Sequence, residues 1–175
     1  EANFDMIRLA TALGITVIEP AGNGNIYSSS GNNLDEYRDS SGQKIFDRTA
    51  PGFKDSGAIM VAAAKSDVPH ERMNFSNYGN RIDCYAWGEN ILTAGLHPKS
   101  SGMAINTYTC QFGGTSGAAA IIAGAAISLQ SMMEANYQCR LNPGKMREIL
   151  GNPLYGTISA GRENDDMIGV MPDLE

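Results

Sequence analysis

Histidine and cysteine are scarce in this sequence of 175 residues. The two histidines, His70 and His97, stand near no cysteine or carboxylate at the spacing of a zinc motif, which argues against a zinc site. The three cysteines, Cys84, Cys110 and Cys139, form an odd set without metal-ligand spacing and allow at most one intramolecular disulfide. We expect them to be buried free thiols.

An excess of basic charge and long apolar runs are also absent. The formal net charge of -6 argues against nucleic acid or an anionic membrane as a partner. We expect no segment apolar and long enough to cross a bilayer, and residues 1–8 are too acidic and amphipathic for a signal peptide. With 42% hydrophobic and 18% charged residues, the chain is expected to fold as one globular domain.

The order of predicted elements indicates an α/β fold. A helical rhythm over residues 3–13 ends at Gly14, and the β-branched run Ile15–Ile18 then predicts a short buried strand. Helix followed by strand is half of an α/β unit, so we expect a mostly parallel sheet, and a preceding strand that this chain lacks. The other predicted elements are strands at residues 58–64, 81–86 and 91–94, a buried central helix at 117–135, and a helix at 145–150 opened by Asn142-Pro143-Gly144. Residues 24–54 are predicted to be a long polar loop, loosest at 28–33.

One junction has the form of a nucleophile site. Gly113-Gly114-Thr115-Ser116 runs directly into the apolar helix, so the Ser116 hydroxyl would lie in the first helical turn. The N–H groups and the positive dipole end at a helix start favour negative charge that develops there. Acyl transfer needs such a place, because the attacked carbonyl oxygen becomes an oxyanion. A serine or threonine at a helix start is also an ordinary cap, so this motif needs support from elsewhere in the chain.

A second segment could supply that support. The strand before it ends in Ala21-Gly22-Asn23-Gly24, and ligands of parallel sheets bind beyond the carboxyl ends of the strands. The side-chain amide of Asn23 could therefore donate to an oxyanion, although Asn-Gly is also a common turn dipeptide.

Together, four ordered segments resemble the subtilisin-like serine proteases. The run from Ile15 to Asn23 is similar to the strand that carries the family's oxyanion asparagine, and Phe75-Ser76-Asn77-Tyr78-Gly79 to its Phe-Ser-x-x-Gly segment. Gly114-Thr115-Ser116-x-Ala118 matches the nucleophile motif, and Asn142-Pro143 leads into a similar short helix. The resemblance is strongest over residues 3–152. It implies a three-layer subtilisin-like fold, incomplete at its N-terminal side, with residues 1–175 as the C-terminal portion of the peptidase domain.

The resemblance also implies roles for individual residues. Ser116 would be the nucleophile and Asn23 the oxyanion donor, while Pro20, Ala21, Gly22 and Thr115 would line the substrate site. Glu19-Pro20 replaces residues that are usually small, which would narrow or acidify the specificity pocket, and Ala120 replaces a proline of the helix. The family also implies calcium, with Asp35, Glu36, Asp39 and Asp47 as candidate ligands. We favour a solvated acidic loop for these residues, because they show no fixed ligand spacing.

The family's Asp-Ser/Thr-Gly and His-Gly-Thr motifs, which hold the catalytic aspartate and histidine, do not occur at their places in this sequence. Asp55-Ser56-Gly57 follows Asn23 instead of preceding it and is predicted to be a loop, and His70 and His97 are predicted to be exposed loop residues. The resemblance implies that the parent protein is a secreted serine endopeptidase. We expect the isolated chain to be inactive, because a serine without a base is a weak nucleophile.

Other readings remain open. The exposed sheet edge could lead to homo-oligomers, or the missing half of the domain could cover it. The main alternative function is a subtilase-like pseudoenzyme or binding scaffold. An amidase would need a Ser-x-x-x-Lys partner, and a phosphate site at Gly22-Asn23-Gly24 would need a helix directly after it.

Overall fold

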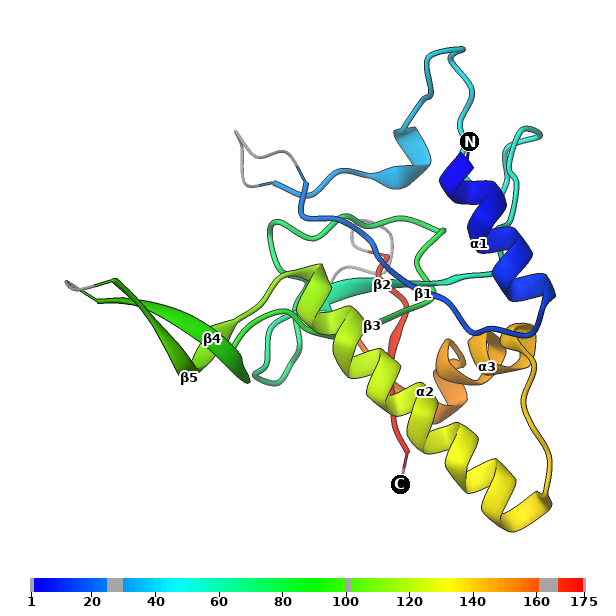
Figure 1. Cartoon of the computed structure of the whole chain (residues 1–175). Helices are drawn as coiled ribbons and strands as arrows, with labels where there is room; N and C mark the ends of the chain where they lie inside the picture. The colour runs from blue at the N-terminus through cyan, green and yellow to red at the C-terminus, as the bar shows by residue number, and fades with distance from the viewer. Residues whose placement is uncertain (1, 25–29, 100–101, 161–166, 175) are drawn as a thin grey trace.

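The computed structural model describes residues 2–24, 30–99, 102–160 and 167–174 (Figure 1). The predicted loose stretch at 28–33 therefore lies partly outside the described residues. The described elements, in chain order, are α1 (Ala2–Ala12), β1 (Ile18–Pro20), the 3-10 helix η1 (Leu34–Glu36), β2 (Ile59–Ala64), β3 (Cys84–Trp87), β4 (Ile91–Lys99), β5 (Gly102–Phe112), α2 (Thr115–Tyr137), α3 (Pro143–Leu150), the 3-10 helix η2 (Pro153–Tyr155), β6 (Gly156–Ile158) and β7 (Val170–Pro172).

The main sheet is mostly parallel, which confirms the predicted fold class. Its strand order is β1-β2-β3-β7-β6, and only β6 runs antiparallel, against β7. β1 is an edge strand of this sheet as far as the described residues show. Parallel order places the carboxyl ends of β1, β2 and β3 at one end of the sheet, where ligand sites of such folds lie.

Two strands begin later than the sequence indicates. The strand predicted at 15–18 is β1, at 18–20, because the amide of Ile15 still donates to the carbonyl of Ala10 in the turn that ends α1 (3.0 Å). The strand predicted to start at Arg81 starts at Cys84, because a turn closed by the Ile82 amide and the Gly79 carbonyl (3.1 Å) precedes it. The strand predicted at 58–64 is confirmed as β2, and all six of its residues are buried.

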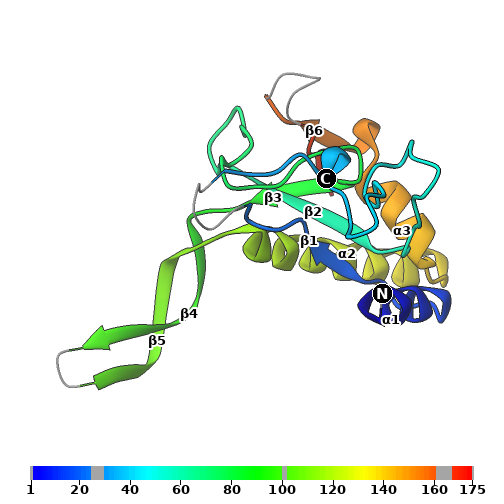
Figure 2. The same ribbon diagram turned by 90° about the horizontal axis from the view of Figure 1, so that it is seen from above.

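Each face of the sheet has its own core. On one face, α2 and α3 pack through Ala118, Ile122 and Met146 against β2 and β3, and α2 lies below these strands in Figure 2. On the other face, Met60, Ala62 and Tyr85 pack against Ala21 and the loop residue Leu34. The Tyr85 hydroxyl donates to the carbonyl of Thr157 (3.0 Å), and burial raises the pKa of Tyr85 to about 12.

Helix α2 is less buried than its sequence predicts. It extends over Thr115–Tyr137, and its buried residues are Thr115, Gly117, Ala118, Ile122 and Ala126. The outward side exposes Ile121, Ile127, Met132 and Tyr137, so the prediction of a buried helix is wrong for this chain. By length and composition α2 could also cross a membrane, contrary to expectation, although a core helix passes the same test. Its packing on the sheet makes α2 a layer of this domain.

The strand predicted at 91–94 is one arm of a longer hairpin. β4 and β5 pair antiparallel from Ile91 opposite Phe112 to Lys99 opposite Gly102, and the ribbon projects away from the body in Figures 1 and 2. β5 was not predicted, because its sequence mixes polar and small residues without regular apolar alternation. Its carboxyl end leads through Gly113 and Gly114 into α2.

The last predicted helix is confirmed as α3. The Asn142 side chain caps it by accepting a hydrogen bond from the Lys145 amide (2.8 Å), and Pro143 occupies the first turn. All three cysteines are free thiols, but only Cys84 is buried as expected, and burial raises the pKa of its thiol. Cys110 and Cys139 are exposed, on the outward side of β5 and beyond the end of α2.

Candidate active site

Ser116 is the second residue of α2 and is exposed to solvent. The turn that delivers it is fixed by close backbone contacts: the Gly114 amide donates to the Gly88 carbonyl at the end of β3 (2.8 Å). A Cβ at Gly113 would lie 2.3 Å from that same carbonyl oxygen, so only glycine fits there. The first-turn N–H groups of α2 are therefore held beside the Ser116 hydroxyl, at the carboxyl end of the sheet.

Asn23 lies against this helix start, although 92 residues separate it from Thr115. Its Oδ1 accepts from both the backbone N–H and the hydroxyl of Thr115, each at 2.9 Å. Both bonds use the oxygen, so neither engages the Nδ2 donor of the amide. Asn23 is exposed like Ser116, whereas Thr115 between them is 1% exposed. The Ser116 hydroxyl and the Asn23 side chain are therefore exposed to solvent, and the buried Thr115 holds Asn23 in place through two hydrogen bonds.

The residues predicted to line a substrate site divide into two groups. Pro20 is exposed and Gly22 is half-buried, so both can be reached by a bound chain. Ala21 and Thr115 are buried. The Thr115 hydroxyl accepts from the Gly22 amide (3.2 Å) and donates to Asn23, so its described contacts hold the loop from Ala21 to Asn23 in place.

Of the two predicted loop histidines, His70 is the one whose side-chain surroundings the structure describes. His70 is 7% exposed, so the prediction of an exposed side chain is wrong. Its Nδ1 lies 3.0 Å from the Lys65 carbonyl and its own carbonyl accepts from Ser159, which fixes it in a loop. His97 belongs to β4 and pairs with Ala104. Asp55 lies in the loop before β2, as predicted, where it accepts from the Gly57 amide.

The candidate calcium ligands all have partners within the protein. Asn80 donates to both Asp35 and Asp47, through its backbone amide and its side chain (2.9 Å each). Asp39 accepts from Ser41 and Gln43, and Glu36 pairs with Lys44. Hydrogen bonds from Thr49 and Asn80 lower the pKa of Asp47 to about 2. In the described part of the chain, no group of three or more histidine, cysteine or acidic residues could hold a metal ion.

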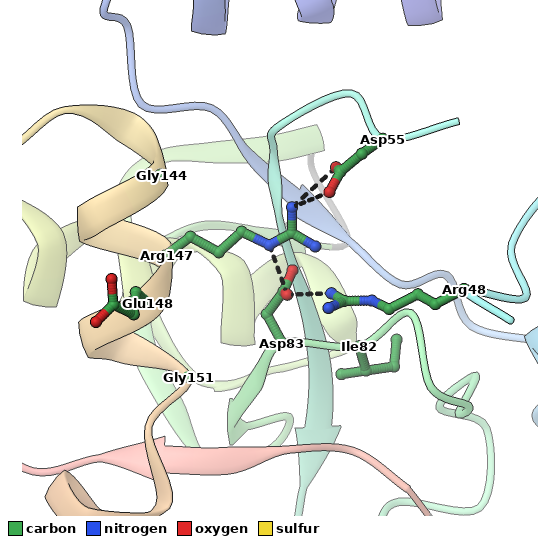
Figure 3. Close-up of a pocket in the computed structure, with 8 residues that line it drawn as sticks. All are labelled: Arg48, Asp55, Ile82, Asp83, Gly144, Arg147, Glu148 and Gly151. Carbon is green, nitrogen blue, oxygen red and sulfur yellow. Dashed lines mark hydrogen bonds and ion pairs between the residues drawn. The ribbon is translucent and has the colours of Figure 1, made fainter. Parts of the chain in front are cut away.

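A second polar cluster surrounds Asp83, with a cavity of about 430 Å³ beside it (Figure 3). The Asp83 carboxylate accepts hydrogen bonds from Arg48, Arg81 (2.8 Å) and Arg147 (2.7 Å). Nη1 of Arg147 also donates to the Asp55 carboxylate (2.8 Å). Since Asp83 immediately precedes β3, this cluster lies at the opposite end of the sheet from Asn23 and Ser116. Nη2 of Arg147 is buried and has no hydrogen-bond partner among the described residues. This nitrogen is shielded from solvent and so is not accessible to a ligand. The bond from Arg147 to Asp83 attaches α3 to the sheet.

Sequence reasoning missed two features of the site. The first is Asn77, whose side chain donates to the carbonyl of Ala21 (2.8 Å) and whose amide donates to that of Gly22 (3.1 Å). The second is the Asp83 cluster. Only the position of Asn77 inside the Phe-Ser-x-x-Gly segment could have pointed to the first, and the spacing of charges gave no signal for the second.

Solved structures with this fold are proteases. A lanthipeptide protease superposes with a TM-score of 0.63 at 20% identity, covering 98% of this chain and 52% of that chain. A protease of Pseudoalteromonas arctica superposes with a TM-score of 0.61 at 20% identity. The match covers 97% of this chain and 44% of that chain. A prenylagaramide maturation protease superposes with a TM-score of 0.58 at 21% identity. The match covers 98% of this chain and 51% of that chain. At such identities the likeness shows the fold, and the chain spans about half the length of these structures.

No curated protein matches the sequence. The family model described as the subtilase family matches residues 2–173, which confirms the resemblance read from the motifs. With nearly its whole length matched, the chain belongs to the subtilase family.

Proposed function

We propose that this chain is the nucleophile-bearing part of a serine endopeptidase domain. Ser116 is the nucleophile and Asn23 the oxyanion donor. The observation that carries the proposal is the pair of hydrogen bonds from Thr115 to Asn23 Oδ1, which brings the amide to the start of the helix that holds Ser116. Family membership supports a hydrolytic role, and the named structural relatives are proteases that include maturation enzymes.

The chemistry divides between this chain and a base that lies elsewhere. When the Ser116 oxygen attacks a peptide carbonyl, its proton passes to that base and negative charge develops on the carbonyl oxygen. Asn23 Nδ2 and the backbone N–H of Ser116 would donate to this oxygen, because the N–H groups of Thr115, Gly117 and Ala118 already bond to Asn23 and Gly114. Loss of one such donor costs about 10²–10³ in kcat in serine proteases. Collapse of the tetrahedral species forms an acyl-enzyme at Ser116 and releases the amine, and water then hydrolyses the ester.

We further propose that a histidine and an aspartate outside this sequence complete the triad, so that the isolated chain is inactive. A serine hydroxyl near neutral pH needs a positioned base to react, and the described surroundings of His70 do not make it one. The substrate would be a polypeptide that passes over Pro20 and Gly22.

A fluorophosphonate probe and a fluorogenic peptide test this proposal. In a protein that contains the whole peptidase domain, we expect labelling and turnover that Ser116→Ala abolishes. Asn23→Ala should lower kcat by about 10²-fold or more while labelling at Ser116 persists more slowly. Ser128→Ala, at an exposed serine on the same helix, is the matched control and should change neither.

Three results would contradict the proposal. Turnover of ordinary rate by the isolated chain would show that no further base is needed. Activity that survives Ser116→Ala would remove the nucleophile. Absence of both labelling and turnover in the whole domain would favour the subtilase-like pseudoenzyme or binding scaffold.

A further inference from the structure

We propose that Asn77 is a positioning residue for the oxyanion donor. It holds the loop from Ala21 to Asn23 on the side opposite to Thr115, and so fixes the direction of the Asn23 amide. This inference rests on the proposed role of Asn23 and concerns a residue that would not itself touch the substrate.

Asn77 anchors both peptide groups that precede the Asn23 Cα. Its Nδ2 donates to the carbonyl of Ala21 (2.8 Å), and its backbone amide donates to the carbonyl of Gly22 (3.1 Å). The amide of Gly22, which belongs to the same peptide group as the Ala21 carbonyl, donates to Thr115 Oγ1 (3.2 Å). One peptide group is therefore bonded at both of its ends, by Asn77 and by Thr115. The next peptide group is bonded by Asn77.

Before Gly22, the loop is held by the amide of buried Ala21, which donates to the Val61 carbonyl of β2 (2.8 Å). β1 ends at Pro20, and Gly22 has a φ of +93°, a conformation that glycine adopts without the strain that a side chain would cause. A Cβ at Gly22 would lie 2.8 Å from Asn77 Nδ2, so the close approach requires glycine there. Asn23 is exposed and would rotate away from the oxyanion position if the two preceding peptide groups moved.

Asn77 is itself held to the centre of the sheet. The neighbouring Ser76 is fully buried, its hydroxyl accepts from the Ala63 amide of β2 (2.9 Å), and it donates to the Asn77 carbonyl (3.1 Å). Asn77 Oδ1 accepts from the Asn32 amide (2.8 Å), which fixes the orientation of the side-chain amide and leaves Nδ2 to face Ala21. A rigid chain of hydrogen bonds thus leads from β2 to the oxyanion loop.

A double-mutant cycle on the whole peptidase domain separates positioning from general stability. Asn77→Asp keeps the acceptor for Asn32 and replaces the donor to Ala21 by a carboxylate oxygen. We expect kcat to fall about tenfold or more, since misplacing an oxyanion donor forfeits part of its effect, with KM changed less than kcat. In an Asn23→Ala background, Asn77→Asp should have little further effect on kcat, because the group that it positions is gone.

The matched control is Asn74→Asp, an exposed asparagine in the same segment that receives the same change of charge. It should leave kcat unchanged in both backgrounds. The proposal would be overturned if Asn77→Asp lowered kcat equally in the wild-type and the Asn23→Ala backgrounds. It would also be overturned if Asn77→Asp changed kcat no more than Asn74→Asp does.

A second readout does not depend on activity. In the chain itself, Asn77→Asp should speed hydrogen exchange at the Gly22 amide, which Thr115 protects, whereas Asn74→Asp should leave it unchanged. Unchanged exchange at Gly22 would overturn the anchoring role. If the whole domain is inactive, or if its activity persists in the Ser116→Ala variant, the proposed function fails. The exchange rate of the Gly22 amide still decides whether Asn77 holds the loop.

Discussion

At the scale of single residues, we expect Asp83 to contribute more to the stability of the fold than any group at the candidate site. Its side chain is 5% exposed, and three arginines share it, among them Arg81 at 3% exposure. Burial lowers the pKa of Arg81, an effect that the charge of Asp83 opposes. The carboxylate also accepts from the Met60 amide (2.8 Å), so it joins β2, β3 and α3 through one group.

We expect Asp83→Ala to lower the free energy of unfolding by about 3–5 kcal/mol, because removing one partner leaves buried charge uncompensated. Asp83→Asn, which keeps the shape and the bond to Met60, should cost less. Urea unfolding followed by circular dichroism measures both. Glu71→Ala is the control, because its ion pair with Lys65 is exposed on both sides and such pairs contribute little. Similar unfolding midpoints for Asp83→Ala and Glu71→Ala would contradict the structural role of Asp83.

Asp47 predicts how stability depends on pH. Its pKa of about 2, below the ordinary aspartate value of 3.8, results first from the hydrogen bond of the Thr49 hydroxyl and then from that of the Asn80 side chain. A carboxyl with a depressed pKa in the folded state stabilises that state above its unfolded pKa, and the contribution is lost as the pH falls toward about 2. Unfolding measured at pH 6, 4 and 3 should show stability falling, and Asp47→Asn should flatten part of this fall. Asp5→Asn, on the exposed helix α1, should leave the slope unchanged, and equal slopes in both variants would contradict the assignment.

At the scale of elements, local signals in the sequence predicted the kinds of element better than their ends. The apolar run at 58–64 and the cap Asn142-Pro143 each determine their element, and the structure confirms both. The start of β1 could not be predicted, because Ile15 reads as a strand residue but bonds back to α1. The hairpin partner β5 and the exposure of α2 depend on contacts distant in sequence, which a single pattern does not report.

The candidate site shows the same division. Ser116 and Asn23 stand in recognisable motifs, and the structure places them at one helix start as the motifs predict. Asn77 bonds to Ala21 and Asn32, which are 56 and 45 residues away in the sequence, so a local pattern does not report these contacts. The burial of His70 was missed because polar flanking residues indicate exposure, whereas the loop folds back so that Ser159 bonds to its carbonyl.

Glycines at the start and in the middle of α2 lead to opposite predictions. A Cβ at Gly124 meets nothing within 4 Å, so Gly124→Ala should raise the free energy of unfolding of the chain by about 0.5–1 kcal/mol through helix propensity. Gly113→Ala should lower it, since the added carbon would lie 2.3 Å from the Gly88 carbonyl oxygen. Thermal unfolding of the two variants measures both signs. A loss of stability for Gly124→Ala would show that another surface already occupies the space beside it.

At the scale of the whole molecule, the chain exposes more surface than a protein of its mass usually does. Its accessible surface is 10758 Å², against about 8,300 Å² expected for a compact monomer of 18.7 kDa. Part of the excess comes from the projecting hairpin (Figure 2). Another part is apolar: α1 has no buried residue, and Met6 and Leu9 in α1 and Leu13 just after it are each more than half exposed. Together with the outward side of α2, these residues form a surface that we propose the remainder of the peptidase domain covers.

This exposure predicts that the isolated chain associates with itself. We expect sedimentation velocity to show dimers or larger species whose population rises with concentration, since apolar patches of this kind drive association. Leu9→Lys combined with Ile127→Lys should shift the chain toward monomer with little loss of stability, because Leu9 is 53% and Ile127 68% exposed. Leu154→Lys, which adds charge at an exposed leucine outside both helices, is the control and should leave association unchanged. In the whole domain the Leu9 and Ile127 substitutions should instead destabilise the fold, because they would bury charge between the two parts. A wild-type chain that stays monomeric at all concentrations would contradict the predicted association, and tolerance of both lysines in the whole domain would show that its remainder packs elsewhere.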